Sequence, residues 1–490
     1  MLFNSWSFLL FFPVVTTLYF LAPFRLRWLL LLLASCVFYM AFIPIYVLVL
    51  AATIVIDYFA AIQMEKSQGR ERARWLVLSI VFTCLILFFF KYYDFFTWNV
   101  NEAARLLHSD LTLSALHLVL PIGLSFHTFQ SLSYVIEVYR GNQKAEHHFG
   151  IYALYVMFYP QLVAGPIERP QNLLHQLREK HEFNYDEVAS GLRLMAWGLF
   201  KKAVIADRLA QFVTPVYDQP GRFDGGTLLV ATLFFAFQVF CDFSGYSDIA
   251  RGAARVMGFK LMLNFDRPYS ATSLTEFWRR WHISLSTWLR DYIYEPIAIG
   301  LRHWGMAGIV FALMVTFLIS GLWHGANWTF VTWGLLYGVG LSLEAIFARQ
   351  RKKLAKALPR LLFSAIMLIV TFSFVNLAYI FFRAKSMGDA ILILRHIYHW
   401  FIPVDRFLFT HLPAMLHKAN SVVSPEHFKL SCALIAFLVI AHSLQARMNI
   451  AERLERSPAW VRWPVYQTVI LSIAFLGIWL DARNFIYFQF

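Results

Sequence analysis

The stretch FALMVTFLISGLWHGANWTFVTWGLLYGVGLSLEAIF, residues 311–347, places one polar motif between two apolar runs. Each run approaches the roughly 20 residues that a helix needs to cross a bilayer. Polar groups in hydrocarbon must find partners inside the protein, so an imidazole is unusual in such a segment. His324 therefore marks either a packed polar contact between helices or a functional site.

The composition of the whole chain agrees with a membrane location. Of its 490 residues, 59% are apolar and 15% are charged, whereas soluble domains carry roughly 25% charged residues. Apolar runs of membrane length recur from end to end and predict an all-α polytopic membrane protein with about 11–13 membrane helices. The expected spans are about 5–23, 27–43, 45–63, 74–93, 114–137, 187–206, 226–249, 305–322, 328–347, 361–383, 428–446 and 465–482.

No repeat or separate soluble region divides the chain, so residues 1–490 are expected to form one transmembrane domain. Residues 152–170 are apolar but broken by Pro160, Gly165 and Pro166, which favours an irregular or re-entrant segment lined by protein. Residues 251–304, which carry His282, are too polar to span. We expect them to form interfacial or re-entrant helices on the cytoplasmic side.

The net charge of +14 follows from 43 basic and 29 acidic residues. In a membrane protein the positive-inside rule and anionic lipid headgroups account for such an excess, and no nucleic-acid partner is expected. The basic segments 25–28, 65–74, 140–144 and 349–360 are therefore predicted to be cytoplasmic. The first three place the N-terminus on the periplasmic face of a bacterial inner membrane, with residues 384–427 also outside.

Residue chemistry alone leaves the role of His324 open between helix packing and catalysis. A metal or haem site is disfavoured, because no second ligand lies at a suitable spacing nearby. His282, beside Arg279 and Arg280, is by itself an ordinary interfacial histidine. Asp242 and Tyr246 end an apolar run, where they are suited to capping a helix, orienting a buried imidazole or contacting an acyl-carrying arm.

The motifs together resemble the membrane-bound O-acyltransferase family. The resemblance rests on TEFWRRWHISLSTWLRDYIY at 275–294 and on SGLWHGANWTFVTWG at 320–334. It extends through PIGLSFHTFQSLSYVIEVYRG at 121–141, YPQLVAGPIERP at 159–170 and FCDFSGYSD at 240–248. Within the family, the chain is most similar to the branch that O-acetylates exported polysaccharides such as alginate. One departure is EPIAIGLRHWG at 295–305, where relatives usually carry a PLGGN stretch.

This resemblance implies a helical bundle around a central tunnel, with His324 as the essential active-site histidine and His282 as a second recurring polar residue. It also implies acetyl transfer from a cytosolic thioester to an exported polysaccharide or to periplasmic acetyltransferase relay proteins. Acetyl-CoA or another acyl thioester would then be the donor substrate, with no metal and no tightly bound cofactor. D-alanyl or other acyl transfer from a carrier protein, and a non-enzymatic transporter or flippase, are the alternatives.

In the implied reaction, His324 acts as general base on the acceptor hydroxyl, or as a nucleophile that carries the acyl group. Asn327 or a local backbone N–H is a candidate for oxyanion stabilisation worth about 3 kcal/mol. Trp323 and the Asp242–Tyr246 pair are further substrate-binding candidates. Arg279 and Arg280 are candidates for pairing with donor phosphates, although positive-inside placement explains them equally well.

Overall fold

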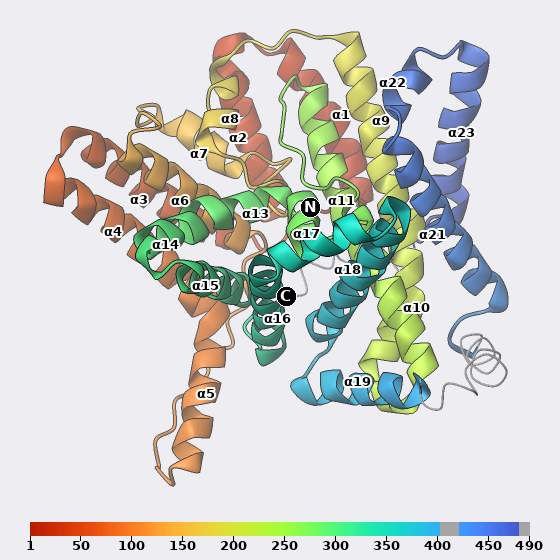
Figure 1. Ribbon diagram of the computed structural model, residues 1–490. Helices are drawn as coiled ribbons and strands as arrows, with labels where there is room; N and C mark the ends of the chain where they lie inside the picture. The colour runs from red at the N-terminus through yellow and green to blue at the C-terminus, as the bar shows by residue number, and fades with distance from the viewer. Residues whose placement is uncertain (402–420, 480–490) are drawn as a thin grey trace.

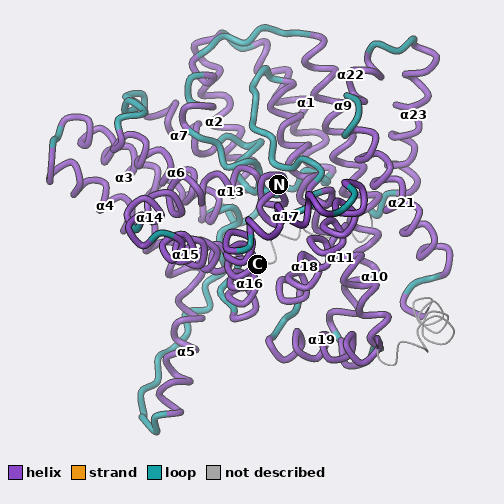
Figure 2. The backbone as a smooth tube through the Cα atoms, viewed as in Figure 1, coloured by secondary structure: helices purple, strands orange, loops and turns teal. Residues whose placement is uncertain are grey.

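The computed structural model describes residues 1–401 and 421–479 of the chain, and this part is built from helices without any strand (Figures 1 and 2). This result confirms the predicted all-α polytopic architecture. The first half contains α1 Trp6–Leu21, α2 Phe24–Met40, α3 Tyr46–Lys66, α4 Gly69–Leu87, η1 Phe88–Tyr92, α5 Tyr93–Leu106, α6 Leu124–Arg140, α7 Phe149–Met157, α8 Pro170–Leu173, η2 Gln176–Arg178, α9 Tyr185–Leu199, η3 Phe200–Ala206, α10 Asp207–Asp218, η4 Pro220–Arg222 and α11 Gly225–Val256.

The second half begins with a series of short helices and continues into long ones. It contains η5 Pro268–Ser270, α12 Leu274–Arg280, α13 Ile283–Leu289, η6 Arg290–Tyr294, α14 Glu295–Gly300, η7 Arg302–Trp304, α15 Met306–His324, α16 Trp328–Ile346, α17 Ala348–Ala357, α18 Arg360–Arg383, α19 Met387–Phe401, α21 Pro425–Gln445, α22 Ile450–Glu455 and α23 Ala459–Leu476. The segment predicted to be interfacial, 251–304, therefore starts on the last turn of α11 and is otherwise made of short helices and turns.

Within the described residues, seven helical segments are long and apolar enough to cross a membrane. This number is smaller than the 11–13 expected because several apolar helices, such as α1 with 16 residues and α2 with 17, are shorter than a full span. The expected span at 114–137 is wrong in its first half. The helix begins only at Leu124, because Pro121 removes a backbone donor and Gly123 adopts a left-handed φ of 80°.

The broken apolar segment at 152–170 has the irregular form that its prolines predict. Helix α7 ends at Met157, and residues 158–168 continue as turns and loop whose side chains are all buried. Irregular backbone at membrane depth is stable only when protein surrounds it. This segment therefore lies inside the bundle, away from lipid.

Helices α15 and α16 form the antiparallel hairpin that carries the opening sequence motif. Their backbones approach closely at Gly321 and Gly334, where an added Cβ would lie 2.3 Å from the Phe330 and Phe317 carbonyl oxygens, respectively. Small residues allow helix backbones to approach this closely in membranes. The hairpin turn consists of Gly325, Ala326 and Asn327, and it fixes His324 at the end of α15.

Helices α4 and α5 form one continuous rod that is interrupted by the π-helical turn η1. The rod carries α5 out of the bundle as a projecting arm (Figure 1). A π-turn inserts one extra residue per turn and so redirects the side chains that follow it. In this chain the π-turn carries Lys91 and Tyr92, which both reach the end of α15.

Candidate active site

His324 is the last residue of α15 and is buried, with 4% of its surface exposed. Three aromatic rings meet its imidazole edge-on: Trp323 at 4.9 Å, Trp333 at 4.9 Å and Phe382 at 5.2 Å between ring centroids. These rings come from α15, α16 and α18, respectively. The imidazole therefore lies in a pocket of aromatic side chains where three helices meet.

His282 is fully buried and adopts a left-handed backbone conformation, with φ of 44°, immediately before α13. A non-glycine residue in this region is uncommon and is often found at functional sites. The Phe243 ring lies edge-on at 4.6 Å, and the Phe126 ring stacks at 6.1 Å. Burial lowers the pKa of His282 to about 3, so the ring is neutral at physiological pH.

Asn264 determines how the His282 ring is oriented. Its side-chain oxygen accepts hydrogen bonds from the Ser284 backbone N–H at 3.2 Å and from the Ser284 hydroxyl at 2.9 Å. The same oxygen lies 3.3 Å from His282 Nδ1. Because this oxygen can only accept, His282 carries its proton on Nδ1, and the lone pair is on Nε2.

Trp323 joins the two histidines. Its ring lies 4.9 Å from the His324 ring and 6.1 Å from the His282 ring. The indole N–H donates to the Ser125 carbonyl at 3.3 Å, and Phe129 stacks on the indole at 5.2 Å. The structure thus brings both Trp-His motifs together around one indole, although they are about forty residues apart in the sequence.

Lys91 and Tyr92 bind the C-terminal end of α15 at the carbonyl groups that lack helical donors. The side-chain nitrogen of Lys91 donates to the Trp323 carbonyl and, at 3.2 Å, to the His324 carbonyl. The Tyr92 hydroxyl donates to the Leu322 carbonyl at 2.9 Å. Donors at these positions stabilise the last turn of a helix, and here they fix the backbone that carries His324.

A column of stacked aromatic rings leads from Trp323 to the side of the bundle at η6. Phe129 lies parallel to Trp288 at 3.9 Å and to Trp323 at 5.2 Å, with interplanar angles of 7° and 12°. Trp288 in turn contacts Tyr292 at 5.0 Å. The column therefore connects the histidine pair with the polar end of η6.

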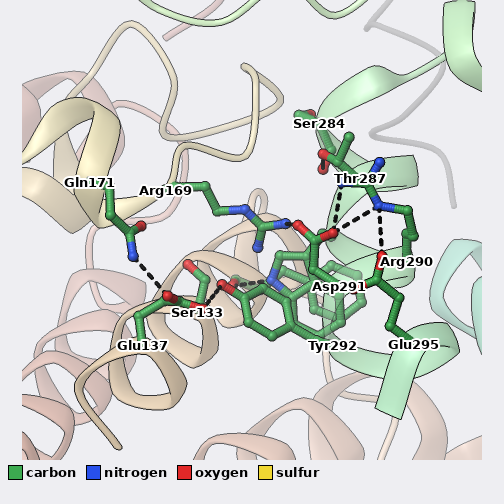
Figure 3. A network of polar contacts seen from close by, with 12 residues as sticks. Ser133, Glu137, Arg169, Gln171, Ser284, Thr287, Arg290, Asp291, Tyr292 and Glu295 are labelled. Atoms are coloured by element: carbon green, nitrogen blue, oxygen red, sulfur yellow. Dashed lines mark hydrogen bonds and ion pairs between the residues drawn. The ribbon is translucent and has the colours of Figure 1, made fainter. Parts of the chain in front are cut away.

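A network of charged and polar side chains surrounds Tyr292 at this end (Figure 3). The Tyr292 hydroxyl donates to Glu137 at 2.9 Å, and the Gln171 amide donates to the same carboxylate at 2.8 Å. Arg169 pairs with Asp291 at 2.9 Å and lies 4.4 Å above the Tyr292 ring. These contacts cross-link α6, the loop before α8 and η6, and so they hold the outer end of the column.

Of the remaining predicted site residues near the two histidine motifs, Asn327 and Arg280 have structural contacts. Asn327 is the N-cap of α16, where its oxygen accepts from the Thr329 N–H, and its amide nitrogen donates to the Lys385 carbonyl at 3.3 Å. The amide nitrogen proposed as an oxyanion donor thus donates to a backbone carbonyl, while the side-chain oxygen caps α16. Arg280 pairs with Glu276 at 2.8 Å, and Arg279 is exposed at the end of α12.

Asp242 and Tyr246 belong to the buried part of α11. Asp242 accepts a hydrogen bond from Lys202 at 2.7 Å, and Lys202 also pairs with Asp207 at 2.8 Å. Tyr246 contacts the ring of Phe3 at 4.6 Å. The ion pair between Lys202 and Asp242 joins η3 to α11 and gives Asp242 a structural role that the sequence did not reveal.

Lys91, Tyr92 and Asn264 are the residues of the site that sequence reasoning missed. A lysine inside the apolar run FFFKYYDFF, residues 88–96, is a signal, because intramembrane charges are costly and tend to have partners. Asn264 follows no such pattern. Among residues 1–401 and 421–479, no group of three or more metal-ligating side chains gathers.

Two imidazoles buried at helix ends, and brought together around one indole, form a candidate site for acid–base group transfer inside a polytopic bundle. A family model for the membrane-bound O-acyltransferases matches residues 143–384, which include both histidines. The chain is 34% identical to the peptidoglycan O-acetyltransferase of Helicobacter pylori, over 94% of this chain and 91% of that protein. It is 39% identical to the "Probable alginate O-acetylase" of Pseudomonas aeruginosa, over 80% of this chain and 73% of that protein.

A more distant similarity, 28% identity over 59% of this chain, relates it to the teichoic acid D-alanyltransferase of Streptococcus thermophilus, of which it covers 75%. The chain belongs to the membrane-bound O-acyltransferase family and is an O-acyltransferase. This assignment confirms the resemblance found in the sequence. It favours the enzyme over the transporter alternative.

Proposed function

We propose that the protein transfers an acetyl group from a cytosolic acyl thioester to a hydroxyl group on an exported glycan or on a periplasmic relay protein. The donor would be acetyl-CoA, and the protein would lie in the bacterial inner membrane with its N-terminus in the periplasm. The names of two relatives, a peptidoglycan O-acetyltransferase and an alginate O-acetylase, support acetyl as the group transferred and a glycan as its acceptor.

The observation that carries this proposal is the histidine pair held by Trp323. His324 lies at the hairpin turn where α15 ends, beside the projecting rod of α4 and α5. The aromatic column and the Tyr292 network extend from this pair along the segment 251–304, which is predicted to lie on the cytoplasmic side. A thioester that approaches from the cytoplasmic side would bring its carbonyl to His324, while the acceptor would reach the same imidazole from the opposite face.

In the proposed reaction, His324 takes the proton of the acceptor hydroxyl as its oxygen bonds to the thioester carbonyl carbon. The tetrahedral intermediate then collapses, the carbon–sulfur bond breaks, and the imidazolium returns its proton to the leaving thiolate. The products are an ester and a free thiol, and no proton is left over. General base catalysis of this kind contributes about 10²–10⁴-fold to the rate. His282, held as the Nδ1–H tautomer by Asn264, would position the donor beside His324.

The test is to replace His324 with Gln in cells that depend on this chain for acetylation, and to measure acetyl groups per sugar in the exported glycans by NMR. We expect acetylation to be lost while the protein level in the membrane is unchanged. His303→Gln, at an exposed turn, is the matched control and is expected to keep full acetylation.

Normal acetylation by His324→Gln would contradict the proposal. If the glycans of the wild type carried D-alanyl esters in place of acetyl esters, the transferred group would be D-alanyl. The similarity to a teichoic acid D-alanyltransferase makes this alternative worth testing. The same NMR spectra distinguish the two esters.

A further inference from the structure

A pocket of about 190 Å³ lies between the α1–α2 turn, the start of α7 and η2. Its floor is apolar and reaches core residues, with Leu31, Ile151 and Leu154 all at least 95% buried. Its rim carries Arg25, Arg27 and Arg178. An apolar floor beneath a basic rim suits a ligand that joins an anionic group to a hydrocarbon chain.

The charges at the rim are only partly neutralised by the protein. Arg178 pairs with the buried carboxylate of Glu146, and Glu179 is the only acidic residue among those that line the pocket. The Arg27 guanidinium is held by three backbone carbonyls, including that of His181, which fix its position but carry no net charge. In the described part of the chain, no carboxylate forms an ion pair with Arg25 or with Arg27, although Glu182 interacts electrostatically with Arg27. These two guanidinium groups therefore lack a directly paired anion.

The surface next to the pocket is one that a bilayer would cover. Below Arg25, helix α2 exposes Leu26, Leu29 and Leu33, with 53%, 37% and 57% of their surface accessible. Helix α1 exposes a similar series at helical spacing, from Leu10 to Leu21. In a membrane-spanning chain such leucines contact acyl chains. The pocket is lined by Phe24, Arg25 and Arg27, at the turn that joins the ends of α1 and α2. A helix end of this kind lies near the lipid headgroups when the helix crosses a bilayer.

We propose that this pocket binds the headgroup of an anionic phospholipid, with its phosphate between Arg25 and Arg27 and an acyl chain along the exposed leucines of α2. Basic segments of this kind face the cytoplasmic leaflet, where the anionic lipids are. The exposed leucines of α2, which follow Arg25 in the chain, favour a phospholipid over a soluble anion. The site is separate from the histidine pair, and its existence does not depend on the proposed function.

The test uses the full chain in nanodiscs and counts bound lipid by native mass spectrometry in mixtures of phosphatidylglycerol and phosphatidylcholine. We expect the wild type to retain phosphatidylglycerol selectively. Arg25→Gln should bind it roughly fivefold more weakly, as the loss of one cation at a membrane surface implies. Arg70→Gln, an exposed arginine at the start of α4 and outside the pocket, is the matched control and should retain lipid like the wild type.

Equal retention of the two lipids by the wild type, or equal retention of phosphatidylglycerol by Arg25→Gln and Arg70→Gln, would overturn the proposal. Displacement of bound phosphatidylglycerol by acetyl-CoA would overturn it in favour of a site for a soluble donor. A thermal-shift measurement with the same two lipids gives an independent readout. Stabilisation by phosphatidylglycerol should exceed that by phosphatidylcholine in the wild type and fall in Arg25→Gln.

Discussion

Replacing Lys91 with Met is the most informative change outside the histidines. Lys91 hydrogen-bonds to the backbone carbonyl of His324, the residue expected to do the chemistry, and not to its imidazole. Its side-chain nitrogen donates to the Trp323 and His324 carbonyls and to the Ser125 hydroxyl at 3.3 Å. A methionine would fill the same space without donating. The two carbonyl groups at the end of α15 would then lack their donor.

The size of the effect follows from these contacts. A buried polar group that loses its hydrogen-bond partner destabilises the protein by about 1–3 kcal/mol. Because two carbonyl groups would lose their donor, we expect the last turn of α15 to shift so that they find other partners. A displacement of about 1 Å at a reacting group lowers a rate by about 100-fold. We therefore expect kcat to fall by about two orders of magnitude while KM for the thioester stays near its wild-type value.

The assay is acetyl transfer from labelled acetyl-CoA by purified protein in nanodiscs, with the melting temperature measured on the same samples. Lys91→Arg, which keeps a cationic donor, should recover part of kcat. If Lys91 only filled space, Lys91→Arg would not have a higher kcat than Lys91→Met. Lys66→Met, at the exposed end of α3, is the matched control. A wild-type kcat in Lys91→Met would refute the positioning role, and a raised KM with unchanged kcat would indicate contact with substrate instead.

Three further predictions test other parts of the structure. Asn264→Ala should lower kcat about fivefold to tenfold without loss of folded protein, because one hydrogen bond of about 1 kcal/mol orients His282; a wild-type kcat would contradict this. Gly334→Ala should destabilise the protein by about 1–3 kcal/mol and so lower its melting temperature, because the added methyl group would collide with the backbone of α15. Gly300→Ala, with open space around it, should leave the melting temperature unchanged. Burial raises the pKa of Glu168 from 4.5 to about 7, so the unfolded chain binds fewer protons than the folded protein between these values, and stability should fall as pH rises through this window. Glu168→Gln should remove up to about 3 kcal/mol of that dependence in denaturation at pH 5 and pH 8, and an unchanged pH profile would contradict the assignment.

The sequence predicted those parts of the fold that depend on local patterns. Apolar runs marked most of the long helices, and the prolines of 152–170 predicted the irregular buried segment. The span expected at 114–137 was wrong because residues 114–120 are apolar in composition yet remain outside any helix. Hydropathy alone does not distinguish an apolar loop from the first turns of a helix.

For the candidate site, the two Trp-His motifs predicted His324 and His282, which the structure brings together around Trp323, but they did not predict the residues that orient them. Lys91 lies more than 230 positions before Trp323 and His324, and its contact with them depends on the π-turn η1, which has no sequence signature here. The role of Asp242 was equally hidden, because its partner Lys202 lies on a different helix. A single sequence does not specify which polar residues, far apart in the chain, pair with one another in the fold.

The most direct test of the central claim is acetyl transfer across a membrane by the purified protein. The protein is reconstituted in liposomes with labelled acetyl-CoA on the face of the basic loops and oligosaccharides from the host's exported glycan on the other. The wild type should place label on the oligosaccharide, and His324→Gln should not, although it inserts and melts like the wild type. Transfer by His324→Gln at the wild-type rate would contradict the account.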